Sequence, residues 1–371
     1  MKMSRFVPYL GAVAAIIVVV FVASIPSSTT VSNIPVNIAV VPVATSTHAD
    51  VNSAEENLTQ IFPVTEKSAT PEIALPQESE VPSLQTTFSP ISAITSLLDQ
   101  TALDSSASAL RGALVNIICT VPSGTVLHSI SGSGVFVDSK GIILTNAHVA
   151  QYFLLADRGA SCSIRSGSPA VDNYEAELIY ISPNWLRANS KVISTTAPSG
   201  TGEYDFAFLA VTKSYRNTSF PHIPLAINPS LPGTPVVIAS YGAQFLESSQ
   251  VRNSLSPIVV FGSVKDVFTF GTNTIDVFAL GGSAAAQEGS SGGGVSDSSG
   301  YLVGTITTSS TSGTTDTRSL GAITASYIRA AYASETGEAL DLLLSTPTET
   351  SINNFAPKIP TLESIITADL P

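Results

Sequence analysis

The chain has 371 residues, of which 44% are hydrophobic and only 12% are charged. Apolar side chains therefore suffice for a sizeable core, and Ser, Thr and Asn must supply much of the polar surface. The net charge of -12 and the low total of 16 Lys and Arg residues argue against nucleic-acid binding, because a phosphate-binding face needs clustered basic side chains.

The first predicted element is an uncharged apolar run over residues 6–25. As a helix it would be about 30 Å long, the thickness of a bilayer's hydrocarbon core, so it can cross a membrane. Lys2 and Arg5 precede it and no basic cluster follows, which predicts a cytoplasmic N-terminus (residues 1–5) and a single-pass anchor, with the rest periplasmic or extracellular. A cleaved signal peptide is the competing interpretation, but the site at Ala23 is weak and the run is long, so we favour the anchor.

Residues 26–95 contain no Gly, Trp, Tyr or Cys, have repeated prolines and are rich in Ser and Thr. Such a segment cannot bury enough apolar surface to offset its chain entropy, which predicts a flexible, disordered stalk. From Ile91 to Leu114 the apolar side chains have helical spacing, so we expect a short helix that leads into the first strand.

The folded part is predicted over residues 96–345. From Ala113 to about Ile328, short apolar or alternating runs are separated by Gly, Pro, Asn and Asp, which indicates an all-β barrel or sandwich. The segment from Ala325 to Leu344 is rich in Ala and Leu and predicts a C-terminal helix, broken near Gly337. Prolines interrupt residues 346–371, which are predicted to be a flexible tail.

Three short motifs place a polar side chain where a strand pattern stops. They are Thr-Asn-Ala-His-Val ending at Val149, Asp205 at the start of an apolar run, and Gly-Ser-Ser-Gly-Gly from Gly289. Taken singly, each has an ordinary explanation: a histidine at a strand end, a surface acid and a flexible Gly/Ser loop. The chain has only four histidines, so finding one in this order before an Asp and a glycine-rich Ser motif is hard to reach by chance.

Acyl transfer by serine requires this combination of groups. A hydroxyl attacks, a base takes its proton, an acid orients the base, and backbone N–H groups bind the oxyanion. The sequence therefore predicts a catalytic triad of His148, Asp205 and Ser291. Glycines around the nucleophile let the N–H groups of Gly289 and Ser291 point at one spot, so these form the predicted oxyanion hole.

In these motifs the chain resembles chymotrypsin-like (trypsin-fold) serine proteases and, within them, the HtrA-like branch of exported bacterial proteases. The resemblance implies two six-stranded β-barrels with the active site between them, His148 and Asp205 in the first barrel and Ser291 in the second. It also implies protein or peptide substrates and no cofactor. The matching segments are residues 132–135, 141–149, 205–209, 233–239 and 289–293.

The chain departs from the HtrA-like pattern after the barrels, where too few residues remain for a PDZ domain. The segment from Asp157 to Asp205 is long and is expected to contain an inserted surface loop. Oligomerisation stays open, because the N-terminal aromatic contacts that would support the trimers common in this branch are not recognisable.

The resemblance also indicates which segments form the walls of the substrate pocket, and these carry no charge. Their candidate residues are Ala285 before the nucleophile and Thr307 and Ser309 after it. A buried Lys or Arg head would find no partner there, so we expect cleavage after small or medium apolar residues such as Val, Ala or Leu.

The two cysteines, Cys119 and Cys162, lack the paired spacing of a zinc site, so no metal site is predicted. Both lie in strands that the resemblance assigns to one barrel, and we expect a disulfide in an oxidising exterior. Trypsin-like zymogens pair a newly cut N-terminus with an acid directly before the nucleophile, whereas that residue here is Ser290. The sequence therefore predicts that no activating cut is required.

Two alternatives differ in class from an active serine peptidase. One is a catalytically silent binding module that keeps the protease fold at the cell surface; the complete triad argues against it. The other is a hydrolase with a cysteine nucleophile. Both cysteines lie in strand-like runs without a glycine-opened turn, so a buried thiol is the better interpretation.

Overall fold

The structure, a computed structural model, describes residues 90–125, 127–194, 202–215, 219–271, 273–309, 313–368 and 370. The predicted cytoplasmic N-terminus, the predicted membrane segment and nearly all of the predicted stalk lie outside these residues. Within the described part of the chain, no helix is both long and apolar enough to cross a membrane.

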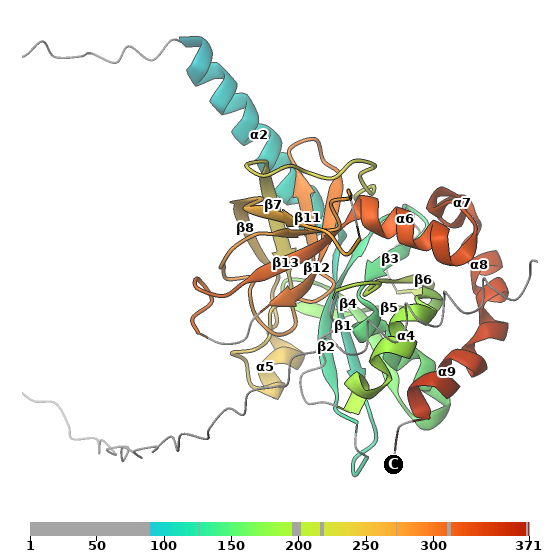
Figure 1. Ribbon diagram of the computed structural model, residues 1–371. Coiled ribbons are helices and arrows are strands. Elements are labelled where there is room, and N and C mark those ends of the chain that lie inside the picture. The colour runs from blue at the N-terminus through green and yellow to red at the C-terminus, as the bar shows by residue number, and fades with distance from the viewer. Residues whose placement is uncertain are drawn as a thin grey trace, which may run out of the picture. The chain divides into compact units, whose positions relative to one another are not determined.

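Six antiparallel strands form a closed barrel in the order β1-β2-β3-β6-β5-β4, as expected for the first barrel (Figure 1). Short turns join β2 to β3 and β4 to β5, and apolar side chains such as Val135, Ile143 and Leu209 fill the interior. The strands are β1 (Leu114–Thr120), β2 (Ile130–Phe136), β3 (Ile142–Thr145), β4 (Ser161–Gly167), β5 (Ala170–Ile181) and β6 (Ala207–Ser214).

The second half is a curled seven-stranded sheet in the order β8-β7-β11-β12-β13-β10-β9, which fits the second half of a trypsin-like double barrel but has seven strands, where six were predicted. The apolar run after Pro257 forms a single strand, Ile258–Ser263. In the structure the chain turns at Val264, whose N–H donates to Thr234, and continues as a separate short strand. The strands are β7 (Pro235–Ser240), β8 (Ile258–Ser263), β9 (Asp266–Phe268), β10 (Val277–Ala279), β11 (Gly294–Asp297), β12 (Leu302–Ser309) and β13 (Leu320–Thr324).

Helix α2 (Pro90–Ala113) confirms the helix expected before the first strand, although it begins inside the predicted stalk. It passes into β1 without an intervening residue and packs on β7 and β11 of the second sheet (Figure 1). Leu110 and Ala113 are fully buried, and the Ser106 hydroxyl is 2.8 Å from that of Ser296 on β11. The part of α2 from Ser106 to Ala113 is therefore packed within the folded domain.

Five short helices lie between the strands. The segment from Asp157 to Asp205, expected to hold a surface loop, is mostly regular structure: it contains β4, β5 and two of these helices, and residues 195–201 lie outside the description. The helices are α3 (Ala147–Ala150), η1 (Gln151–Arg158), α4 (Pro183–Asn189), η2 (Ser190–Ser194) and α5 (Ser248–Asn253).

The C-terminal segment is helical and packed, so the prediction of a flexible tail over residues 346–371 is wrong. The predicted break near Gly337 is present, with a left-handed φ of 77°. The prolines that suggested a loose tail lie at helix starts, where a missing N–H costs nothing. The helices are α6 (Ala325–Thr336), α7 (Leu340–Ser345), α8 (Thr348–Phe355), η3 (Ala356–Lys358) and α9 (Ile359–Thr367).

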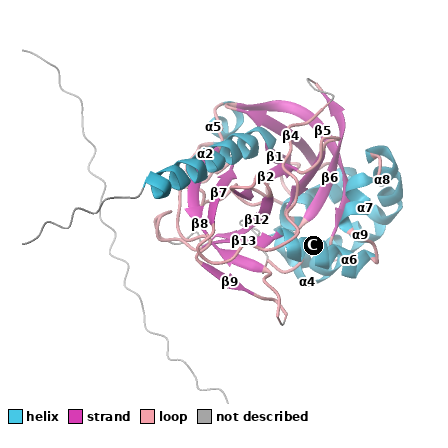
Figure 2. Cartoon of the chain, turned by 90° about the horizontal axis from the view of Figure 1, so that it is seen from above, coloured by secondary structure: helices cyan, strands magenta, loops and turns pink. Residues whose placement is uncertain are grey.

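These last helices cover the first barrel, on the opposite side of the domain from α2 (Figure 2). Helix α8 packs on β5 and β6, and α9 packs on α4. Glu335 on α6 accepts hydrogen bonds from the Tyr180 hydroxyl, from Ser182 Oγ (2.8 Å) and from the Asn184 N–H (3.2 Å). The helix that follows the second sheet is thus bonded to the end of β5.

Cys119 on β1 and Cys162 on β4, which the sequence suggests as a pair, are disulfide-bonded. They lie directly opposite each other in the register of the two antiparallel strands, with their Cα atoms 4.1 Å apart. Within the described chain neither cysteine is available as a free thiol.

The packing of α9 makes a prediction about stability. Ile366 is fully buried, so Ile366→Ala should lower the free energy of unfolding by about 2–5 kcal/mol through lost burial and a cavity. Ile365→Ala, at the half-buried neighbouring position, is the matched control and should cost less. Urea denaturation followed by circular dichroism measures both, and equal small losses would contradict the packed tail.

Candidate active site

His148 lies just after strand β3, in the short helix α3. Asn146 joins the two elements, and its extended backbone (φ -82°, ψ 154°) turns the chain into the helix. All four residues of α3 are buried, and His148 is 4% exposed. Gln151 Nε2 donates a hydrogen bond of 2.8 Å to the carbonyl oxygen of His148. Packing and this bond fix the main chain that bears the imidazole.

Asp205 is fully buried beside His148, two residues before the start of β6. Its Oδ2 is 2.8 Å from His148 Nδ1, and its Oδ1 accepts a hydrogen bond of 3.0 Å from the His148 main-chain N–H. Thr307 on β12 donates a third bond, of 2.7 Å, to Oδ2. A buried carboxylate needs donors in place of water, and these three supply them.

A tight turn brings the chain to Asp205. The N–H of Asp205 donates to the carbonyl of Gly202 over 3.2 Å, and Tyr204 has a left-handed φ of 56°, which is rare for a bulky residue. The Tyr327 hydroxyl on α6 accepts from the Tyr204 N–H at 3.1 Å. Strained backbone of this kind persists where its surroundings hold it, often at functional sites.

Ser291 lies in a turn that directly precedes β11, and two positions of this turn require glycine. Gly289 and Gly292 have left-handed φ values of 88° and 85°. A Cβ at Gly292 would lie 1.9 Å from the carbonyl oxygen of Ser133, and one at Gly289 would lie 2.7 Å from that of Tyr241. The glycines of the sequence motif therefore let this turn approach β2 and the end of β7 closely.

Ser133 on β2 makes the contacts that hold this turn. Its N–H donates to the Ser291 carbonyl over 2.7 Å, and its hydroxyl donates to the Gly289 carbonyl over 2.7 Å while accepting from the Tyr241 N–H at 2.9 Å. Its own carbonyl accepts from Thr145 Oγ1 at 2.7 Å. Sequence reasoning included Ser133 in a matching segment but gave it no role, because nothing local shows that β2 meets the turn.

A hydrogen bond orients the Glu288–Gly289 peptide, which precedes the predicted oxyanion hole. The Glu288 carbonyl accepts a hydrogen bond of 2.8 Å from the Ala243 N–H, so it points away from the turn's open side. In a trans peptide the next N–H points the opposite way. Among the described residues no acceptor binds the N–H of Gly289 or that of Ser291. Both donors are therefore available to a ligand.

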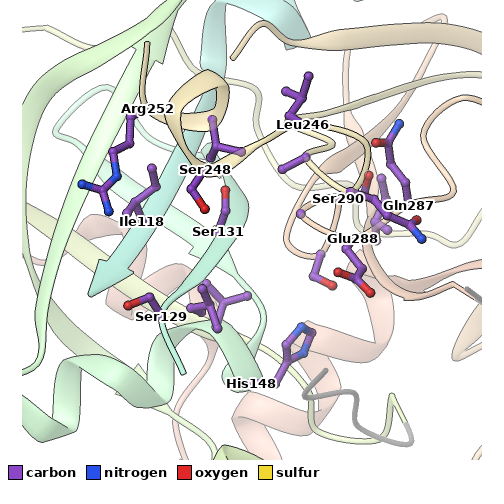
Figure 3. Close-up of a pocket in the computed structure, with 18 of the residues that line it drawn as sticks. Ile118, Ser129, Ser131, His148, Leu246, Ser248, Arg252, Gln287, Glu288 and Ser290 are labelled. Carbon is purple, nitrogen blue, oxygen red and sulfur yellow. The ribbon is translucent and has the colours of Figure 1, made fainter. Parts of the chain in front are cut away.

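His148 and Ser291 line the same cavity of about 490 Å³, shown in Figure 3. Thr307 also lines it, although its hydroxyl is bonded to Asp205. Of the other residues predicted for the substrate pocket, Ala285 is fully buried and does not line this cavity, and the side chain of Ser309 lies outside the description. The apolar pocket before the scissile bond stays a prediction.

Residues 132–304 match the family model of the trypsin-like peptidase domain. The chain contains a trypsin-like peptidase domain. The match includes the His148, Asp205 and Ser291 motifs and confirms the resemblance to trypsin-fold proteases for this part of the chain. None of the curated proteins matches the chain.

The trypsin-like domain is also similar to solved protease structures, all at low identity. The active form of the Rv3671c protease from M. tuberculosis is 19% identical, with 72% of this chain and 96% of that chain covered and a TM-score of 0.41. Its inactive form is 18% identical, with 64% and 96% covered and a TM-score of 0.41. Deg5 is 15% identical, with 56% and 85% covered and a TM-score of 0.39.

In this trypsin-like domain, Ser290 stands directly before the candidate nucleophile and is 1% exposed. Its hydroxyl accepts a hydrogen bond of 3.0 Å from Ser240 Oγ. Nearby, Arg318 donates to the Ala286 carbonyl (2.9 Å) and to Gln244 Oε1 (2.6 Å). Burial raises the pKa of Tyr241 to about 12, so its hydroxyl stays neutral and donates to the Gly167 carbonyl. The segment before Ser291 is thus bonded to a neutral hydroxyl, that of Ser240, and to one arginine, Arg318.

Over the described residues, no three His, Cys, Asp or Glu side chains are grouped so that they could hold a metal ion.

The contacts of Ser133 generate a prediction about turnover. Ser133→Ala removes the hydroxyl that fixes Gly289, so kcat should fall on the order of 10- to 100-fold, while KM changes little. Ser163→Ala, which removes a hydroxyl from β4 on the barrel surface, is the control and should keep full turnover. Steady-state kinetics on a peptide substrate measure both. A Ser133→Ala enzyme with unchanged kcat would show that the oxyanion turn does not need this bond.

Proposed function

We propose that the chain is an exported serine endopeptidase, anchored in a membrane by residues 6–25, in which His148, Asp205 and Ser291 form a Ser-His-Asp triad. The observation that supports it most is the 2.8 Å contact of His148 Nδ1 with a fully buried carboxylate, beside a serine that lines the same cavity. The substrates are proteins or peptides, as for other domains of this class, and the chemistry uses protein groups alone.

The proposed mechanism follows from the hydrogen bonds. Asp205 keeps the proton of the imidazole on Nδ1, so Nε2 is free to take the proton of the Ser291 hydroxyl as Oγ attacks the scissile carbonyl. The oxyanion that forms accepts hydrogen bonds from the N–H groups of Gly289 and Ser291. His148 then gives the proton to the leaving amine, and the acyl group stays on Ser291. Water, deprotonated by the same base, hydrolyses this ester and restores the enzyme.

The proposed location depends on the N-terminal sequence. Residues 6–25 are apolar and uncharged, and the proline-rich residues up to Pro90 give the domain a tether. Two cysteines joined as a disulfide support an oxidising compartment outside the cytoplasm.

Ser291→Ala tests the proposed chemistry. Hydrolysis of casein or of a peptide library should fall by about 10⁴- to 10⁶-fold, because the hydroxyl forms the covalent intermediate. A fluorophosphonate probe should label the wild-type protein and not the variant, as seen by intact mass. Unchanged hydrolysis by the variant would end the proposal. A wild-type protein that neither hydrolyses substrate nor takes the probe would instead favour the silent binding module.

The hydrogen bond of Ser290 leads to a prediction about how the enzyme becomes active. A buried ammonium inserted beside this hydroxyl would lack a carboxylate partner, so we expect activity without an N-terminal cut. A protein comprising residues 90–371 behind an added N-terminal tag should hydrolyse peptides while intact mass shows the tag still attached. Activity that begins only after cleavage near Arg111 would contradict this expectation.

A further inference from the structure

The cavity at Ser291 extends away from the second sheet, along the first barrel to helix α5. We define this part as the α5 arm; it is lined by Ile118, Ser129, Ser131, Ser248, Val251 and Arg252. Figure 3 shows Arg252 far from His148 and Glu288, on the other side of the pocket. The arm therefore starts at the candidate base and ends at a cation.

Arg252 is exposed and has no carboxylate partner among the described residues. Its main chain, in contrast, is firmly held. The buried Arg165 of β4 donates to the carbonyl oxygens of Val251 and Arg252, at the C-terminal end of α5, where a cation also interacts favourably with the helix dipole. The Arg252 side chain thus projects from a fixed backbone while its charge remains unpaired.

Of the positively charged side chains near the α5 arm, Arg252 is the one that a substrate can reach. Arg165 is buried and lies 3.7 Å from Asp172, so its charge has a partner of its own. Glu288 lines the cavity at the end near His148 and leaves the Arg252 end cationic. Between them, the hydroxyls of Ser129, Ser131 and Ser248 give the arm polar walls suited to an extended peptide.

The position of the arm indicates which part of a substrate enters it. The base that activates Ser291 also protonates the leaving amine, so the chain after the scissile bond must pass the imidazole. His148 and Val149 line the same cavity as the α5 arm, whereas Ala285, predicted for the wall that contacts the residue before the bond, does not line it. The arm accordingly receives substrate residues on the leaving side of the scissile bond.

We propose that Arg252 binds a carboxylate of the substrate on the leaving side of the scissile bond. The carboxylate belongs either to an Asp or Glu side chain or to the substrate's C-terminus. This inference rests on the proposed peptidase function and adds a preference for acidic substrate segments. A guanidinium pairs with a carboxylate through parallel N–H donors, which gives the contact geometric specificity. Because the pair is exposed, we expect an effect of about two- to fivefold on kcat/KM.

Internally quenched peptides test the preference with the full chain. Each has Val before the cleaved bond and Asp, Asn or Lys in turn at each following position; a second set compares a free C-terminal carboxylate with a C-terminal amide. Wild type should cleave the best Asp peptide about two- to fivefold faster than its Asn counterpart. In Arg252→Gln this ratio should fall to about one, and in Arg252→Glu the Lys peptide should become the better substrate.

The matched control is Arg187→Gln, which removes one exposed positive charge on α4, away from the cavity. It should keep the wild-type Asp-to-Asn ratio. The second set identifies the source of the carboxylate, since a gain only with a free C-terminus means recognition of the chain end. An Asp-to-Asn ratio and an acid-to-amide ratio that are both the same in wild type and in Arg252→Gln would overturn the proposal.

A binding measurement separates this proposal from the peptidase function. Fluorescein-labelled versions of the same peptides are titrated into the Ser291→Ala protein and into Ser291→Ala combined with Arg252→Gln, and anisotropy is recorded. The Arg252 site is supported if the carboxylate peptides bind more tightly, if this gain is lost without Arg252, and if it weakens at higher ionic strength. This result supports the site even if the wild-type protein cleaves nothing. Cleavage without any Arg252-dependent preference in either assay retains the peptidase and refutes the site.

Discussion

The arrangement of the candidate site depends on the contact between the Ser291 turn and strand β2. The turn belongs to the second sheet, yet its carbonyl groups at Gly289 and Ser291 are bonded to Ser133 of the first barrel. The absence of a side chain at Gly292 permits the approach, because a Cβ there would overlap the Ser133 carbonyl. Main-chain geometry between the two halves, rather than side-chain chemistry alone, sets where the nucleophile and the oxyanion donors lie.

The acid of the site depends on the same docking. Asp205 comes from the first barrel and takes two hydrogen bonds from His148, but its third donor is Thr307 on β12 of the second sheet. Removing a carboxylate from water is costly unless its lone pairs are satisfied, so the halves stabilise each other through this residue as well as through apolar packing. Glu335 is a second carboxylate that joins separate parts of the fold, because its hydrogen bonds connect α6 to β5 and α4.

The residues that the sequence predicts are those whose neighbours along the chain form a recognisable pattern. It does not predict residues whose role depends on contacts formed on folding. His148, Asp205 and Ser291 stand near strand ends beside recognisable neighbours; the β pattern predicts a barrel or a sandwich, and the family resemblance implies the barrel. Ser133 and Arg252 carry no local signal, because the contacts of Ser133 and the proposed role of Arg252 depend on strands and helices that meet only after folding. The C-terminal helices were missed because Pro347 and Pro360 were read as helix breakers, whereas each lies at a helix start, where proline is well tolerated.

Under the proposed function, the shared construction of the site has a consequence for the life of the protein before it is fully folded. A chain in which only one sheet has formed lacks both the Thr307–Asp205 contact and the contact of Ser133 with the Ser291 turn, because each joins the two halves. Such an intermediate has no assembled hydrolytic centre, so it can neither digest its own exposed segments nor attack the machinery that exports it. Activity then begins only when folding is complete. A protease that needs no activating cut is therefore inactive while it crosses a membrane.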